Sequence, residues 1–122
     1  MTLPLLRTSG MIRAAMFYAF AQELRRLEAT DVAPTSFVQV LREAIDDYGV
    51  EPGSISTTFR VTRPTVSRWK SGEATPGIYL RREVVSWIAA RVETEATSLE
   101  PGRRTAVIHL FKVATTLDAD PA

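Results

Sequence analysis

The sequence predicts an all-α protein, and three observations lead to that fold class. Apolar residues recur three and four positions apart over several long stretches, which is the period of an amphipathic helix. Proline and glycine residues separate the longer stretches from one another. The hydrophobic share of 45% and the charged share of 24% are ordinary for a globular protein, so the 122 residues should form one compact helical bundle.

The first helix is expected over residues 11–28, after a loose lead-in over residues 1–10. Its apolar stripe keeps the helical spacing for about five turns and consists of Ile12, Ala15, Met16, Ala19, Phe20, Leu24 and Leu27. Phe17 and Tyr18 widen this stripe beyond one narrow seam. A helix with so wide an apolar surface has to bury more than one side, either in its own core or against another copy of the chain.

The second helix is expected to begin at Ser36, because Gln39 follows three residues later and completes a capping box. Its apolar stripe fits the helical template closely and consists of Phe37, Val40, Leu41, Ala44, Ile45 and Tyr48. Gly49 then supplies the stop signal of the helix.

Residues 54–76 predict two short helices joined by a tight turn at Arg60. The buried side of the first of these helices is expected to consist of Ile55, Ser56 and Phe59. Thr62 is a good N-cap for the second, and Pro64 falls in its first turn, where a missing amide proton costs little. Gly72 ends this second helix.

A long helix is expected over residues 78–95, followed by a break over residues 97–104 and a last helix over residues 105–117. The long helix should bury Leu80, Val84, Trp87, Ile88 and Val92 and carry Arg81, Arg82, Glu83 and Arg91 on its outer face. The β-branched residues of the last segment leave a strand open, but its apolar residues do not alternate, which favours a helix. Residues 118–122 should fray.

Positive charge is concentrated in one part of the chain, although the net charge is only +1. Residues 60–82 contain six cations against one acid, whereas residues 37–51 contain one cation against four acids. Such a basic segment is either a solvated face or a surface for an anionic partner such as nucleic acid.

Few side chains are available for catalysis or metal binding. The chain has no cysteine, and its single histidine, His109, sits in an apolar run. Asp46 and Asp47 are adjacent, so on a helix they diverge rather than converge on one substrate. We therefore expect no enzyme activity, no cofactor and no metal site. The apolar residues 11–21 are too few to span a membrane and are interrupted by Arg13, and no secretory signal is evident, so a cytoplasmic location is expected.

Residues 61–76, VTRPTVSRWKSGEATP, resemble the recognition unit of the Cro/C1-type (XRE-like) helix-turn-helix family. In that family a hydrophobic residue and a Ser or Thr begin the recognition helix, a Val-Ser-x-Trp core follows, and a Gly-x-x-x-Pro turn closes it. Val66 and Trp69 match the core positions, and the resemblance covers at most residues 37–88. It implies a lambda-repressor-like bundle, with extra helices at both ends, whose helix from Thr62 lies in the major groove of double-stranded DNA.

The resemblance also implies roles for individual residues. Arg63 and Thr65 match positions that face bases, and Arg68 matches a position one turn further along the same face. Arginine suits this role because its planar fork can bond O6 and N7 of guanine together. Ser67 and Lys70 would meet backbone phosphates. The candidate DNA-binding residues are Ser54, Thr62, Arg63, Thr65, Ser67, Arg68 and Lys70.

Three positions depart from the family pattern. Arg60 stands at the turn where family members usually have glycine, so the turn has to be strained or altered. Ser56 replaces the alanine that is usual in the first helix of the motif. The polar residue that often contacts phosphate at the start of that helix falls at Pro52 and Gly53, although free amides near Ser54 could still bind a phosphate.

These observations lead to two hypotheses of function. The first is sequence-specific binding of double-stranded DNA by a transcriptional regulator, which acts as a homodimer because one short helix reads only a few base pairs. The alternative is a helix-turn-helix protein-interaction module, such as an antitoxin or a phage-type adaptor, that binds its partner through residues 11–28. In either case we expect a lead-in and helix over residues 1–35, the helix-turn-helix domain over residues 36–96, and a C-terminal helix and tail over residues 97–122.

Overall fold

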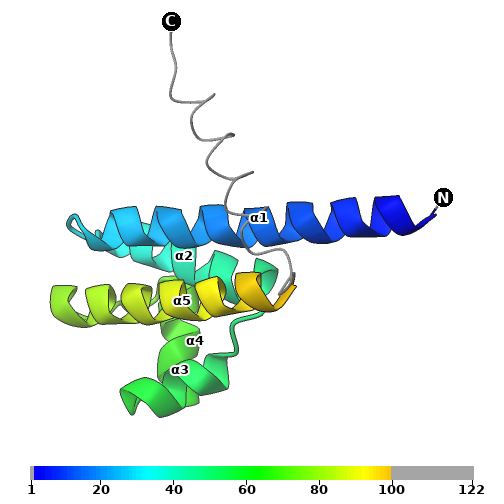
Figure 1. The fold of residues 1–122 in the computed structure, drawn as a ribbon. Coiled ribbons are helices and arrows are strands. Elements are labelled where there is room, and N and C mark those ends of the chain that lie inside the picture. The colour runs from blue at the N-terminus through cyan, green and yellow to red at the C-terminus, as the bar shows by residue number, and fades with distance from the viewer. Residues whose placement is uncertain (1, 100–122) are drawn as a thin grey trace, which may run out of the picture.

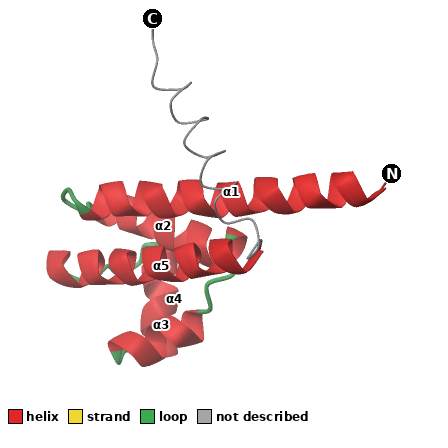
Figure 2. Cartoon of the chain, viewed as in Figure 1, coloured by secondary structure: helices red, strands yellow, loops and turns green. Residues whose placement is uncertain are grey.

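The computed structural model describes residues 2–99 of the chain. This part forms five helices and no strand (Figures 1 and 2), which confirms the predicted all-α class. The helices are α1 (Thr2–Glu28), α2 (Pro34–Asp47), α3 (Pro52–Phe59), α4 (Arg63–Ser71) and α5 (Ile78–Leu99). The helix expected over residues 105–117, with His109, lies outside the described residues.

The two long helices, α1 and α5, lie side by side and antiparallel (Figure 1). Two polar contacts fix their register. The hydroxyl groups of Tyr18 and Thr97 are 3.2 Å apart, and the guanidinium of Arg25 lies 2.8 Å from the carboxylate of Glu93. The hydrogen bonds that Arg25 donates to Glu93, together with one to Glu28, raise the pKa of Arg25. The N-terminal part of α1 extends beyond the rest of the bundle (Figure 1).

α1 differs from its prediction in both length and orientation. The helix begins at Thr2, so the expected lead-in over residues 1–10 is largely helical. Its buried face consists of Ala14, Phe17, Phe20, Ala21 and Leu24, whereas Ile12 and Met16 of the expected stripe are 52% and 55% exposed. Phe20 and Leu24 of the predicted stripe are buried as expected, but the buried face is centred nearer Phe17, because α5 packs along this side of α1 and the Tyr48 ring meets the Phe17 ring.

α2 begins two residues earlier than predicted. Pro34 occupies its first turn, Ala33 is the N-cap without any side-chain hydrogen bond, and the capping box expected from Ser36 is not formed. Proline is well suited to this position because its fixed φ angle is helical and its missing amide proton would have no partner. Gly49, at φ 71°, adopts the left-handed conformation that follows a helix end, as the predicted stop signal requires.

One hydrophobic core holds all five helices together. Phe37, Leu41, Ile55 and Ile88 are fully buried in it, and α1 contributes side chains to the same core. Residues from both of the segments that the sequence predicted, 1–35 and 36–96, therefore contribute to one core. At its edge Tyr48 stacks on Phe20 with ring centroids 4.1 Å apart. Burial, with a smaller effect of nearby carboxylates, raises the pKa of the Tyr48 phenol.

α5 confirms most of its predicted apolar side, and it runs to Leu99 rather than residue 95. Val84, Ile88 and Val92 are buried as expected. Arg81 differs from its prediction as an outer-face residue, because it is half-buried. Its guanidinium donates hydrogen bonds of 2.7 Å to the carbonyl oxygens of Val32 and Pro76 and so joins two loops to α5.

Candidate nucleic-acid interface

The turn between α3 and α4 is built on a left-handed residue. Arg60 has φ 56° and ψ 44°, and its amide donates to the carbonyl of Ser56. The amide of Val61 donates to the same carbonyl at 3.1 Å, while the Ser56 hydroxyl donates to the carbonyl of Val61. A glycine would adopt this conformation without steric cost, so of the two alternatives predicted for this turn Arg60 takes the strained one.

Thr62 starts α4 as predicted. It is the N-cap of the helix, and its hydroxyl oxygen accepts a 3.2 Å hydrogen bond from the amide of Thr65. The two threonine hydroxyls also lie 2.8 Å apart. Pro64 falls in the first turn, and Gly72 ends the helix in the left-handed conformation with φ 83°. The sequence therefore placed both ends of α4 to within one residue.

Two side chains seat α4 on the bundle. Val66 and Trp69 are 1% and 4% exposed, and the Trp69 ring meets Phe37 of α2 edge to face with centroids 5.9 Å apart. Such an aromatic pair adds about 0.5–1.5 kcal/mol to the energy of the buried area. The rigid seat leaves the opposite side of the helix to the solvent.

The solvent side of α4 is polar and positively charged. The exposed residues on or before its first two turns include Thr62, Arg63, Ser67 and Arg68, all of which were candidate DNA-binding residues. Thr65, also a candidate, is half-buried and its hydroxyl faces that of Thr62. Thr65 is therefore engaged in the cap of the helix, which weakens its expected role in reading bases.

Arg63 links α4 to the start of α3. A Cβ atom placed on Gly53 would lie only 3.1 Å from a guanidinium nitrogen of Arg63, so glycine at this position makes room for the arginine. Arg63 also lines a shallow hollow together with Ser54, Thr57 and other polar residues of α3. The first residues of α3 and α4 therefore form one continuous surface with a cation between them.

Ser54 fits its expected role only in part. The residue is half-buried, and its amide already donates a 3.0 Å hydrogen bond to the carbonyl of Glu51. This amide is thus not free for a phosphate, contrary to the expectation for the amides near Ser54. Its side chain lies at the hollow beside Arg63, so a hydroxyl contact is compatible with the structure.

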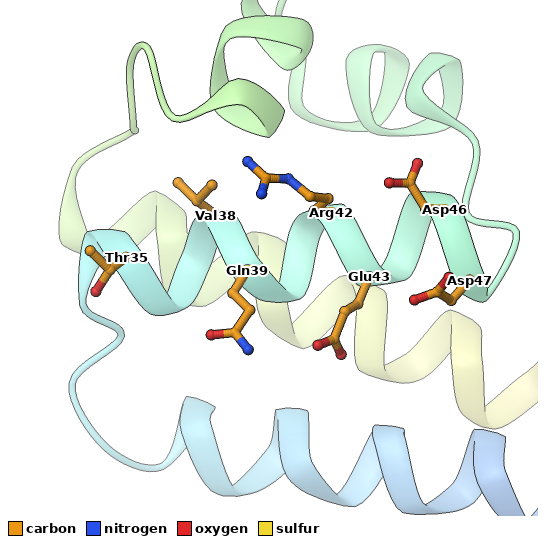
Figure 3. Close-up of a pocket in the computed structure, with 7 residues that line it drawn as sticks. All are labelled: Thr35, Val38, Gln39, Arg42, Glu43, Asp46 and Asp47. Atoms are coloured by element: carbon orange, nitrogen blue, oxygen red, sulfur yellow. The ribbon is translucent and has the colours of Figure 1, made fainter.

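Lys70 contacts two residues of α2 and does not extend freely into the solvent. Its ammonium group lies 2.8 Å from a carboxylate oxygen of Asp46, and Arg42 donates a 3.1 Å hydrogen bond to the carbonyl of Lys70. Figure 3 shows Arg42 and Asp46 on the same side of α2, while Asp47 points away from them. The two neighbouring aspartates diverge, as predicted, but the pairing of Asp46 with Lys70 was not anticipated from the sequence. The spacing of Arg42 and Asp46, four residues apart, was the available signal that they share one face.

The described part of the chain contains neither a cluster of potential metal ligands nor a membrane-spanning helix. No group of three or more His, Cys, Asp or Glu side chains there could hold a metal ion. No helix within residues 2–99 combines the length and the hydropathy that crossing a membrane would require. Protein-family models, curated proteins and solved structures provide no match to this chain.

Proposed function

We propose that this protein binds double-stranded DNA in a sequence-specific manner, with α4 in the major groove, and acts as a transcriptional regulator. The observation that carries the proposal is the division of α4 into two sides. Val66 and Trp69 are buried and fix the helix, whereas Arg63, Ser67 and Arg68 are exposed along the other side. A groove-reading helix needs both a rigid seat and cationic or small polar side chains that reach bases and phosphates.

The proposal is tested by selecting bound sequences from random duplexes and measuring the affinity of variants for the selected duplex. Arg63→Ala and Arg68→Ala should each weaken binding by about 1–3 kcal/mol, because a bidentate arginine contact to guanine contributes about this much discrimination. Arg26→Ala is the matched control, since Arg26 is an exposed arginine on α1. Binding without any sequence preference, or equal effects of all three variants, would contradict the proposal.

The protein is further proposed to act as a homodimer that is formed through α1. One nine-residue helix reads only a few base pairs, so a second copy on a second half-site increases both affinity and specificity. Ile12, Met16 and Ala19 form an exposed apolar row on α1, where 52% of Ile12 and 55% of Met16 are accessible. The helix expected over residues 105–117, which is another segment that could join two copies, lies outside the described residues.

Solution mass tests the dimer. Met16→Lys should convert a dimer to a monomer at micromolar concentration, because a charged side chain would be buried without a partner in the centre of the row. Gln22→Lys adds the same charge at an exposed polar position of the same helix and should leave the mass unchanged. A dimer that persists in Met16→Lys would rule out this face of α1.

The same exposed row favours a second candidate function, a helix-turn-helix module that binds a partner protein through α1. An apolar row of this kind suits the helix-on-helix contacts of such modules. The two functions are separated by one comparison. A monomer that shows no sequence preference among duplexes at physiological salt supports the protein-interaction module, whereas a dimer with sequence preference supports the DNA-binding regulator.

A further inference from the structure

An acidic side chain of α2 neutralises a cation at the edge of the proposed interface. Lys70 Nζ lies 2.8 Å from Asp46 Oδ1, and the two side chains are 37% and 48% exposed. Arg42 donates to the carbonyl of Lys70 at 3.1 Å, so α2 holds the last turn of α4 through the backbone as well. In Figure 3 the side chains of Arg42 and Asp46 both point to the side of α2 on which α4 lies.

Lys70 is close to the residues that are proposed to contact DNA. Lys70, Arg63 and Ser67 line one shallow hollow between α2, α3 and α4. A backbone phosphate that is bound by Ser67 or Arg63 would therefore lie within reach of the long Lys70 side chain. The carboxylate of Asp46 would then compete with that phosphate for the same ammonium group.

We propose that Asp46 is an intramolecular counter-ion of Lys70 that keeps this lysine from a backbone phosphate and thereby limits the sequence-independent part of DNA binding. The inference rests on the proposed function. Because both side chains are partly exposed, the ion pair contributes little to folding and can be exchanged for a phosphate or removed by substitution. Phosphate contacts add affinity without adding sequence information, so Asp46 sets the strength and the salt dependence of binding rather than the sequence preference.

Asp46→Asn tests the proposal, and Asp47→Asn is its matched control. Both substitutions remove one negative charge from neighbouring exposed positions of α2, but only Asp46 contacts Lys70. In Asp46→Asn the ammonium group of Lys70 can bind a phosphate, which releases one more counter-ion from the DNA. The slope of log affinity against log salt should therefore steepen by about 0.9. The ratio of affinities at 50 and 200 mM salt should therefore increase about 3.5-fold in Asp46→Asn relative to the wild type.

Two further variants test whether Lys70 causes the steeper salt dependence. In a Lys70→Ala background, Asp46→Asn should leave the slope unchanged, since the freed cation is missing. Lys70→Ala alone should change the wild-type slope little, because Asp46 already neutralises the lysine. The affinity ratio between the selected duplex and a random duplex should stay the same in all of these variants, since phosphate contacts are shared by every sequence.

The outcomes separate this inference from the proposed function. A wild-type chain that binds no duplex, or binds without sequence preference, contradicts the proposed function. A wild type that binds its selected duplex, together with equal slopes in Asp46→Asn and Asp47→Asn, overturns the counter-ion role alone. A changed ratio between selected and random duplexes in Asp46→Asn would also overturn it, because Asp46 would then orient α4 instead. Thermal unfolding of each variant checks that folding is retained.

Discussion

Replacing Arg60 with glycine should make the protein more stable. Arg60 is the only residue other than glycine within residues 2–99 that has a positive φ angle, at 56°. In this left-handed conformation the Cβ atom lies too close to the following carbonyl oxygen, which costs roughly 1–2 kcal/mol, and glycine has no Cβ atom. Arg60→Gly removes this strain.

The size of the gain follows from two opposing effects. Glycine gives the unfolded chain more conformational freedom, which offsets about 0.5–1 kcal/mol of the relieved strain. The net increase in the free energy of unfolding should therefore be about 0.5–1 kcal/mol. For a folded unit of about 100 residues this corresponds to a rise of about 2–6 °C in Tm.

The assay is chemical denaturation followed by tryptophan fluorescence, since Trp69 is buried in the core and Trp87 contacts Phe59 at the end of α3, next to the turn. Arg60→Ala is the control, because alanine removes the guanidinium but keeps the Cβ atom and the strain. Its stability should match that of the wild type within about 0.5 kcal/mol. An equal increase in stability in both variants would mean that the lost charge is responsible. An unchanged stability of Arg60→Gly would refute the strained turn.

Three further predictions concern the seat of α4 and the packing of α1. Thr62→Ala removes the N-cap and should lower stability by about 1 kcal/mol, with Thr62→Ser largely retaining it, as measured by denaturant midpoints. Phe37→Ala leaves a cavity beside Trp69 and should cost about 3–5 kcal/mol by calorimetry, whereas a loss below about 1 kcal/mol would mean that α2 and α4 are not packed as described. Because burial raises the pKa of Tyr48, its contribution to stability is fully present below about pH 10, the ordinary value, and is lost as the pH rises through the raised pKa. Tyr48→Phe should therefore reduce the fall in Tm between pH 9 and 11, and an unchanged fall would contradict the burial of this phenol.

The position of α4 was predictable because the signals that begin and end this helix are local. Thr62 as the N-cap, Pro64 in the first turn and Gly72 at the end each act within a few residues, and the structure places all three as predicted. The buried positions Val66 and Trp69 follow from the same short pattern. Local backbone chemistry thus specified α4 almost to the residue.

The errors arose where neighbouring helices decide the outcome. α1 carries more apolar residues than one face can bury, and its packing against α5 and Tyr48 buries Phe17 while Met16 stays exposed. Arg81 was expected outside, but the carbonyls of Val32, which is distant in sequence, and of Pro76 accept its hydrogen bonds. The pairing of Lys70 with Asp46 likewise joins residues 24 positions apart in sequence, which no local pattern relates.

The most direct test of the central claim is the affinity of the Arg63→Ala, Arg68→Ala double variant for the selected duplex over a range of salt concentrations. If α4 reads DNA, the double variant should bind at least about thirtyfold more weakly than the wild type, and its log affinity should fall less steeply with log salt. Arg26→Ala should retain both properties of the wild type. A double variant with wild-type affinity and wild-type salt dependence would contradict the placement of α4 in the major groove.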